Sequence, residues 1–178
     1  MSNLPERAFF NAQFTLRLLS IALTSAAIVT MLHSHEALII ADIFVMEARY
    51  NYTSALRFIL GADIVVCACS VLSLIFVFLL SGPRSNLQQS FFIVFLHDLA
   101  MAMLMMAGCG AATAISVVSR AGLSRVGWIP ICGQVSKFCN KVALSVGFSY
   151  SIVVCYLLLT VMTVHNLKSK SPARQEGI

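Results

Sequence analysis

Four stretches of the chain are nearly free of charge and are each long enough to cross a lipid bilayer. A helix needs roughly 20 consecutive apolar residues to span a hydrocarbon core of about 30 Å. The four stretches cover residues 14–32, 58–80, 91–118 and 142–164. The pattern therefore predicts an all-α membrane protein, built as a bundle of four transmembrane helices.

The connections between the stretches predict how the chain is organised. Four crossings bring both termini to one side of the membrane. Residues 81–90 form a short connection with Gly82-Pro83, a pair that breaks a helix and allows a tight reversal. The other two connections, residues 33–57 and 119–141, are long. We expect an N-terminal segment, one membrane domain and a disordered tail, over residues 1–13, 14–164 and 165–178.

The orientation of the bundle in the membrane is predicted from two loop features, since the distribution of Lys and Arg does not decide it. These residues usually favour cytoplasmic loops, yet, leaving out Arg17, the side with the termini holds five and the other side six. Asn51 opens an Asn-Tyr-Thr glycosylation sequon in the first long loop. Cys132 and Cys139 lie together in the second, which suits oxidising conditions. We expect cytosolic termini and two extracellular loops.

The composition narrows the function classes. Hydrophobic residues make up 59% of the chain and charged residues 11%, whereas about a quarter of a soluble domain is charged. The net charge of +5 is spread over tails and loops without a basic run, so nucleic-acid binding is not expected. No nucleophile–base pair, metal-ligand cluster or cofactor loop appears in the sequence. We expect no enzyme, no metal and no cofactor.

Two charged residues inside the stretches need compensation. A charged side chain in the bilayer costs about 2.5 to 3.5 kcal/mol on insertion scales. Arg17 lies early in the first stretch and Asp98 early in the third, which runs in the same direction, so their depths are compatible. We predict an interhelical ion pair. The alternative is that Arg17 snorkels to the headgroups while Asp98 is protonated or bonds to His97 or a serine.

A third charge, Asp63, lies near the long-loop end of the second stretch. We expect it to pair with Arg57 or to face the loop. Intramembrane carboxylates mark proton and ion routes in transporters. However, no Pro-broken or Gly-interrupted half-helix marks a midplane site in these stretches.

Small residues recur every fourth position in the third stretch. Gly108 and Ala112 form one ridge, and Gly110 and Ala114 form the next. This spacing lets helices approach closely. The contact can lie within the bundle or between subunits, and the spacing does not decide between them.

The second long loop carries a cysteine pair and a tryptophan. Cys132 and Cys139 are too far apart for CxxC redox chemistry and lack a second ligand set for zinc. We predict a disulfide between them, with free buried thiols as the alternative. Trp128 is expected to be an aromatic anchor at the membrane interface.

Three features together resemble a known family over essentially the whole chain. They are an Arg early in the first stretch, FLHDLAMAMLMMAGCGAATAI with its Asp in the third, and WIPICGQVSKFC before the fourth. These resemble the plant Casparian strip membrane domain protein-like (CASP-like) family, which is related to the four-span MARVEL proteins. By this resemblance Arg17 and Asp98 occupy the family's charged positions. Its second-loop motif falls on Trp128, Cys132, Phe138 and Cys139.

The resemblance implies a non-enzymatic plasma-membrane scaffold. Founding members of the family form immobile platforms that position lignin-polymerising enzymes in the root endodermis. The first long loop, HSHEALIIADIFVMEARYNYTSALR, lacks their nine-residue signature, so a CASP-like role is expected and not a Casparian strip role. Expected partners are further copies of the chain, related family members, membrane lipid and wall-modifying enzymes outside the cell. A small proton-coupled transporter or channel that uses Asp98 is the alternative function.

Overall fold

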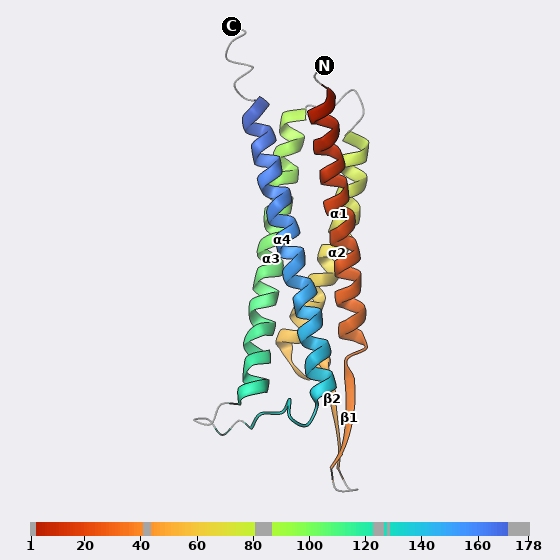
Figure 1. The fold of residues 1–178 in the computed structure, drawn as a ribbon, viewed down its shortest axis with the longest axis vertical. Helices are drawn as coiled ribbons and strands as arrows, with labels where there is room; N and C mark the ends of the chain where they lie inside the picture. The colour runs from red at the N-terminus through yellow and green to blue at the C-terminus, as the bar shows by residue number, and fades with distance from the viewer. Residues whose placement is uncertain (1–2, 41–43, 81–86, 123–126, 128, 171–178) are drawn as a thin grey trace.

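The described residues form four long helices. These helices run side by side along the molecule (Figure 1). The computed structural model describes residues 3–40, 44–80, 87–122, 127 and 129–170. The helices are α1 (Asn3–Leu32), α2 (Ser54–Leu80), α3 (Leu87–Ala121) and α4 (Ser136–Lys170). All four are long and apolar enough to cross a membrane, over Phe9–Leu32, Ser54–Phe76, Phe92–Ala121 and Ser136–Asn166. The predicted four-helix membrane fold is confirmed.

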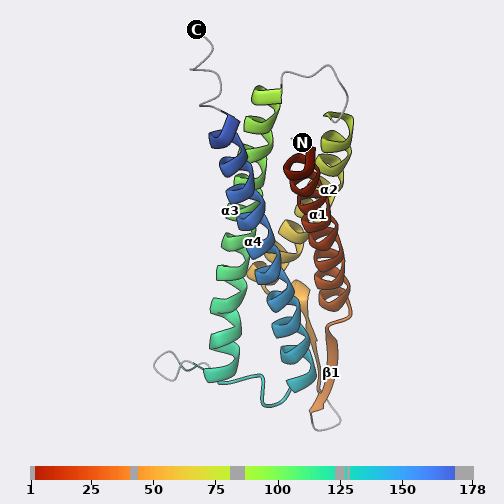
Figure 2. The same ribbon diagram turned by 45° about the horizontal axis from the view of Figure 1, so that its top comes forward.

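The helices form a ring around a common interior. Both α1 and α3 pack against α2 and α4, so α1 faces α3 and α2 faces α4 across the ring (Figure 2). Consecutive helices are antiparallel, which gives the bundle two distinct ends (Figure 1). We call the end with the chain termini the termini end and the opposite end the long-loop end.

Apolar side chains fill the ring and also cover its outside. Fully buried members of the core come from all four helices, and they include Met31, Ile59, Met105, Cys109, Ile152 and Leu159. On the outside, Leu72, Met103 and Val161 are each about two-thirds exposed, at 65%, 66% and 65%. A helix that is apolar on every side suits a lipid environment.

The helices extend beyond the predicted apolar stretches. α1 begins at Asn3, so most of the segment 1–13 is helical. α4 continues to Lys170, and the expected disordered tail is therefore wrong for residues 165–170. The rest of that tail, residues 171–178, lies outside the described residues. No Gly or Pro interrupts residues 148–170, so nothing in the sequence stops the helix at the membrane boundary.

The first long loop contains a β-hairpin that the sequence did not predict. β1 (His35–Ile40) pairs antiparallel with β2 (Phe44–Arg49), and the hairpin extends from the long-loop end (Figure 1). A 3-10 helix, η1 (Tyr50–Tyr52), then leads into α2. The strands combine Ile39, Ile40, Phe44 and Val45, which are enriched in strands, with Glu and Ala, which are depleted there, so their composition is neutral for this structure. The hairpin adds to the helical membrane domain without changing its class.

Candidate functional site

Arg17 and Asp98 meet inside the ring. Arg17 Nη2 of α1 lies 3.0 Å from Oδ1 and 2.7 Å from Oδ2 of Asp98 on α3. The two side chains are 1% and 0% exposed. Because Arg17 is buried, its side chain does not snorkel to the headgroups. The contact crosses the ring between two helices that are not neighbours, and it neutralises both charges.

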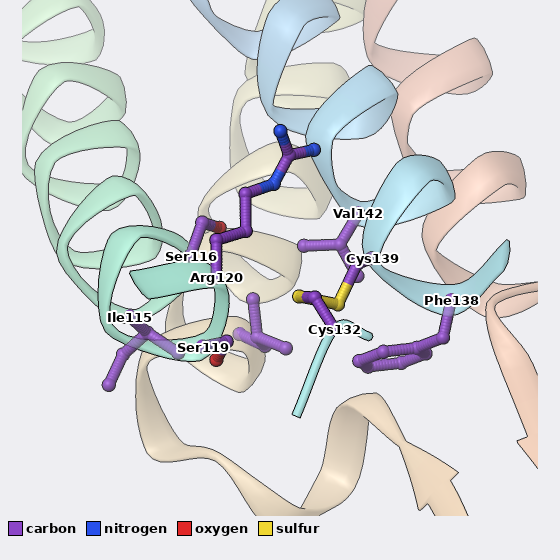
Figure 3. Close-up of a pocket in the computed structure, with 9 residues that line it drawn as sticks. Ile115, Ser116, Ser119, Arg120, Cys132, Phe138, Cys139 and Val142 are labelled. Carbon is purple, nitrogen blue, oxygen red and sulfur yellow. A yellow bond between two sulfur atoms is a disulfide. The ribbon is translucent and has the colours of Figure 1, made fainter. Parts of the chain in front are cut away.

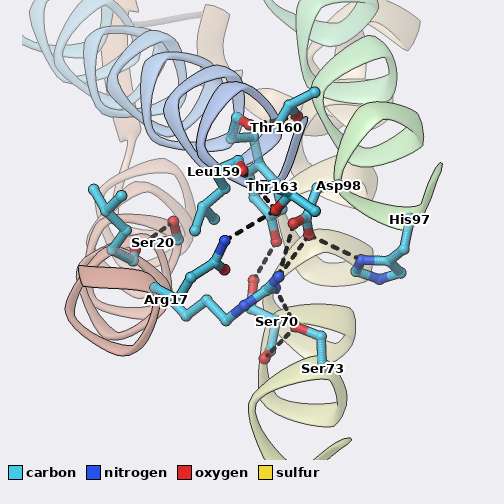
Figure 4. A network of polar contacts seen from close by, with 12 residues as sticks. Arg17, Ser20, Ser70, Ser73, His97, Asp98, Leu159, Thr160 and Thr163 are labelled. Carbon is cyan, nitrogen blue, oxygen red and sulfur yellow. Dashed lines mark hydrogen bonds and ion pairs between the residues drawn. The ribbon is translucent and has the colours of Figure 1, made fainter. Parts of the chain in front are cut away.

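The ion pair extends into a polar cluster that ties all four helices together (Figure 4). Arg17 Nη1 donates to Ser73 Oγ of α2 at 2.5 Å, and Ser73 Oγ donates to the Ser70 carbonyl at 3.1 Å. The hydroxyls of Ser70 and Tyr156 are 2.6 Å apart, which brings in α4. We call Arg17, Ser70, Ser73, Asp98 and Tyr156 the Arg17 cluster.

Three further polar side chains border the Arg17 cluster. His97 Nδ1 lies 3.3 Å from Asp98 Oδ1, and its ring is 27% exposed. Gln13 Nε2 of α1 donates to Thr163 Oγ1 of α4 at 2.9 Å. Within the described part of the chain, Gln13 Oε1 and Arg17 Nε are buried without a hydrogen-bond partner. Their lost hydration is a cost that the charged contacts of the cluster offset.

The geometry of the Arg17 cluster suits a structural role, that of holding the helices together. Both oxygens of Asp98 face a guanidinium, and removing one partner of a buried ion pair costs about 3 to 5 kcal/mol. The described residues contain no group of three or more His, Cys, Asp or Glu side chains that could hold a metal ion. The arrangement can hold the helices in register.

Asp63 makes a second buried polar contact, nearer the long-loop end. Its side chain is fully buried, and Ser149 Oγ of α4 lies 3.1 and 3.2 Å from its two carboxyl oxygens. One turn away, Ser145 Oγ donates to the Ala27 carbonyl of α1 at 2.8 Å. The prediction that Asp63 pairs with Arg57 or faces the loop is therefore wrong.

The start of α2 explains why Asp63 is buried. α2 begins at Ser54, four residues before the predicted stretch, so Asp63 lies about 14 Å inside the helix. It shares one face with Ile59 and Val66, which are also fully buried. Depth and helical face together place its carboxyl group in the ring.

The two small-residue ridges of α3 face opposite ways. Gly108 is buried, and an added Cβ would lie 3.4 Å from Ile59 Cγ1 of α2; Ala112 is also fully buried. Gly110 and Ala114 are exposed, and nothing lies within 4 Å of a Cβ added to Gly110. One ridge packs α3 against α2, and the other lies on the outer surface of the bundle.

The long-loop end carries the predicted loop residues. A disulfide joins Cys132 to Cys139 in the first turn of α4, with Cα atoms 5.8 Å apart, and Phe138 lies beside it (Figure 3). Asn51 is exposed in η1 at the same end. Trp128, the remaining member of the second-loop motif, lies outside the described residues.

The sequence reasoning missed most of the polar partners. They are uncharged polar residues in the apolar stretches or directly beside them, and their side chains turn into the ring. They are Gln13, Ser70, Ser73, Ser145, Ser149, Tyr156 and Thr163. A signal existed, because polar side chains in membrane helices hydrogen-bond to neighbouring helices. Gln13 and Arg17, one turn apart on α1, are an example of such a face.

Comparison with known proteins identifies the family. The sequence model of the Casparian strip membrane protein domain matches residues 6–155, a range that includes Arg17, Asp98, Cys132 and Cys139. The chain belongs to the Casparian strip membrane protein family. The resemblance to the CASP-like family found in the sequence is thereby confirmed.

Plant CASP-like proteins match this chain over most of their lengths. CASP-like protein 1F2 of Ricinus communis is 43% identical over 169 residues, which cover 94% of this chain and 83% of that protein. CASP-like protein 1F1 of Arabidopsis thaliana is 31% identical over 151 residues, or 85% of this chain and 86% of that protein. No solved structure matches the chain. Family membership and four candidate spans make this a multi-pass membrane protein.

Proposed function

We propose that this CASP-like protein is a non-enzymatic scaffold of the plasma membrane that self-associates into platforms and organises partner proteins. The observation that carries the proposal is the direction of the polar groups. Arg17, Ser73 and Asp98 turn into the ring and bond to one another. The molecule therefore offers its neighbours an apolar lateral surface and the loops at its two ends.

The lateral surface has a place where a second copy can approach closely. Gly110 and Ala114 are exposed one turn apart on α3. Lipid provides no hydrophobic drive for helices to associate, so association depends on the close backbone contact that small residues allow. We place the contact with further copies, or with related family members, on this ridge.

The proposal places the termini in the cytosol and the long-loop end outside the cell. Asn51 is exposed at that end, where a glycan can be attached. The Cys132–Cys139 disulfide lies at the same end and suits an oxidising compartment. In this orientation the hairpin and the disulfide-bonded loop face extracellular partners, of which wall-modifying enzymes are one class.

A proton-coupled transporter that uses Asp98 is not favoured by the geometry. Both carboxyl oxygens of Asp98 face Arg17 Nη2. A guanidinium stays charged in proteins. For Asp98 to bind and release protons, this buried ion pair would have to break in every cycle.

The mass of the purified protein in mild detergent tests the scaffold. We expect discrete oligomers, and we expect Gly110→Leu to yield monomers because the larger side chain fills the ridge. Gly61→Leu is the matched control, because Gly61 on α2 is also exposed with nothing within 4 Å of an added Cβ. If the Gly110→Leu variant still formed oligomers, the contact between copies would lie elsewhere on the surface. If the native protein were a monomer, the scaffold proposal would be contradicted.

Reconstituted vesicles test the transporter directly. We expect no proton- or ion-coupled flux from the native protein. If the native protein carried a flux and Asp98→Asn abolished it, the transporter function would be supported and the scaffold function contradicted.

A further inference from the structure

A small open pocket lies at the long-loop end beside the disulfide (Figure 3). Leu56 of α2, Ile115 of α3 and Val142 of α4 form an apolar wall. The last turns of α3 form a polar side, made by Ser116, Ser119 and Arg120. The pocket therefore combines hydrocarbon with hydrogen-bond donors and one positive charge.

The side chains on the polar side of the pocket have no partner among the described residues. Ser116, Ser119 and Arg120 lie three and four residues apart, so they share one face of α3. Across the residues that the structure describes, none of these side chains makes a hydrogen bond or an ion pair. The Ser70 hydroxyl, by contrast, bonds to the Val66 carbonyl one turn before it. Two hydroxyls and a guanidinium thus remain available to a ligand.

The position of Arg120 indicates the level at which that ligand lies. The candidate span of α3 covers 30 residues and ends at Ala121. It is about 45 Å long, close to the thickness of a bilayer with its headgroups, so Arg120 in its last turn lies at the headgroup boundary. Helix side chains lean toward the helix N-terminus, which here means toward the membrane. Figure 3 shows the guanidinium extending away from the Cys132–Cys139 disulfide. Phospholipid phosphates lie at this boundary.

We propose that this pocket binds the phosphate group of a phospholipid in the leaflet at the long-loop end. The Arg120 guanidinium presents two parallel N–H groups that match a pair of phosphate oxygens. Ser116 and Ser119 offer further donors, and the apolar wall beside them can contact the hydrocarbon of the same lipid. Arg57 and Lys137, both exposed at the same end, add positive charge that favours an anionic lipid.

The helix dipole alone does not explain this arrangement. A cation in the last turn of a helix is favoured by the partial negative charge there, and that effect accounts for Arg120. It does not account for two unbonded hydroxyls that line the same pocket. The lipid site is also independent of self-association, because the pocket is built within a single chain.

Native mass spectrometry of the full chain in detergent tests the site. The probes are phosphatidylglycerol, phosphatidylcholine and diacylglycerol with identical acyl chains. We expect phosphatidylglycerol to bind most tightly. Diacylglycerol, which has no phosphate, should not remain bound to the protein. Arg120→Gln should weaken phosphatidylglycerol binding about tenfold, because it removes a charge-assisted bidentate contact. Lys137→Gln, a basic residue outside the pocket, should change it by less than about twofold.

Two further measurements distinguish the lipid site from non-specific attraction and from a site for free anions. Ser116→Leu fills the pocket while keeping the charge of Arg120, and it should also weaken binding if the site is real. An equal loss with Arg120→Gln and Lys137→Gln would mean non-specific attraction and would overturn the proposal. Inorganic phosphate that displaces the lipid at equal concentration would assign a free-anion site and would also overturn it.

Discussion

At the residue scale, the bundle buries two acids in different surroundings. Asp98 faces a guanidinium, whereas Asp63 faces a single hydroxyl, that of Ser149. Ser149 has one hydrogen to donate, and its Oγ also lies 3.2 Å from the Ser145 carbonyl. The two positions therefore differ in how much they depend on a carboxylate charge.

Replacing each acid by its amide separates these roles. Asp98→Asn should destabilise the bundle by about 3 to 5 kcal/mol, because it leaves Arg17 buried without a counter-charge. Asp63→Asn should change stability by no more than about 1 kcal/mol, because an amide can still accept a hydrogen bond from Ser149. Thermal unfolding in detergent measures both. A charge-swapped Arg17→Asp, Asp98→Arg protein should recover part of the loss, and a normal Asp98→Asn protein would contradict the ion pair.

The sequence predicted the charges of the site but not its neutral members. Arg17 and Asp98 stand out because charged side chains in the bilayer are expensive. Ser70 and Ser73 carry no charge, and either can face lipid with its hydroxyl bonded to its own helix. Tyr156 is mostly an apolar ring with one hydroxyl at its tip. Their inward direction depends on the rotation of each helix in the ring.

At the element scale, one helix uses small residues for two purposes. Gly108 brings α3 close to α2, and Gly110 keeps the outer surface of α3 flat. The two positions are only two residues apart, yet 100° per residue turns them to different faces. Substitution at each position therefore has a different expected effect.

Gly108→Leu should destabilise the single chain. A side chain there meets Ile59 of α2, and overpacking of this kind costs roughly 1 to 3 kcal/mol. We expect a lower unfolding temperature and an unchanged oligomer mass, whereas Gly110→Leu should change the mass and leave the unfolding temperature in place. If the two variants changed the unfolding temperature and the oligomer mass in the same way, the two ridges would not have separate roles.

The elements themselves were only partly predictable. Apolar length predicts the membrane crossings well, because the bilayer sets a minimum length. It does not predict where a helix stops in water, which is why α1 and α4 extend beyond the predicted stretches. The hairpin was missed because cross-strand pairing of β1 with β2 overrides a composition that is neutral for strands.

At the scale of the whole molecule, polar contacts across the ring hold the bundle together at two levels. Asp98 of the Arg17 cluster lies in the first half of α3, toward the termini end, and Asp63 lies in the first half of α2, toward the long-loop end. Each contact joins helices that face one another across the interior. The bundle is thus braced on both diagonals, which suits a rigid scaffold.

Glycan attachment tests the proposed orientation of the whole molecule. In a plant cell, the native protein should lose mass on treatment with an N-glycosidase, and Asn51→Gln should not. Asn140 is exposed at the same end without a sequon, so Asn140→Gln is the control and should behave like the native protein. A native protein without any glycan would remove the sequon's support for this orientation.

By itself the sequence determined the class of protein, the number of crossings, the family and the two costly charges. These properties depend on how many apolar residues follow one another and on which residue types interrupt them, and the chain displays both directly. Only the tertiary structure decided which way each polar side chain points. It buried Asp63, joined Arg17 to Ser73 as well as to Asp98, and turned Gly108 inward and Gly110 outward. The physical reason is that the rotation and register of packed helices arise from contacts between them, which no single stretch of sequence contains.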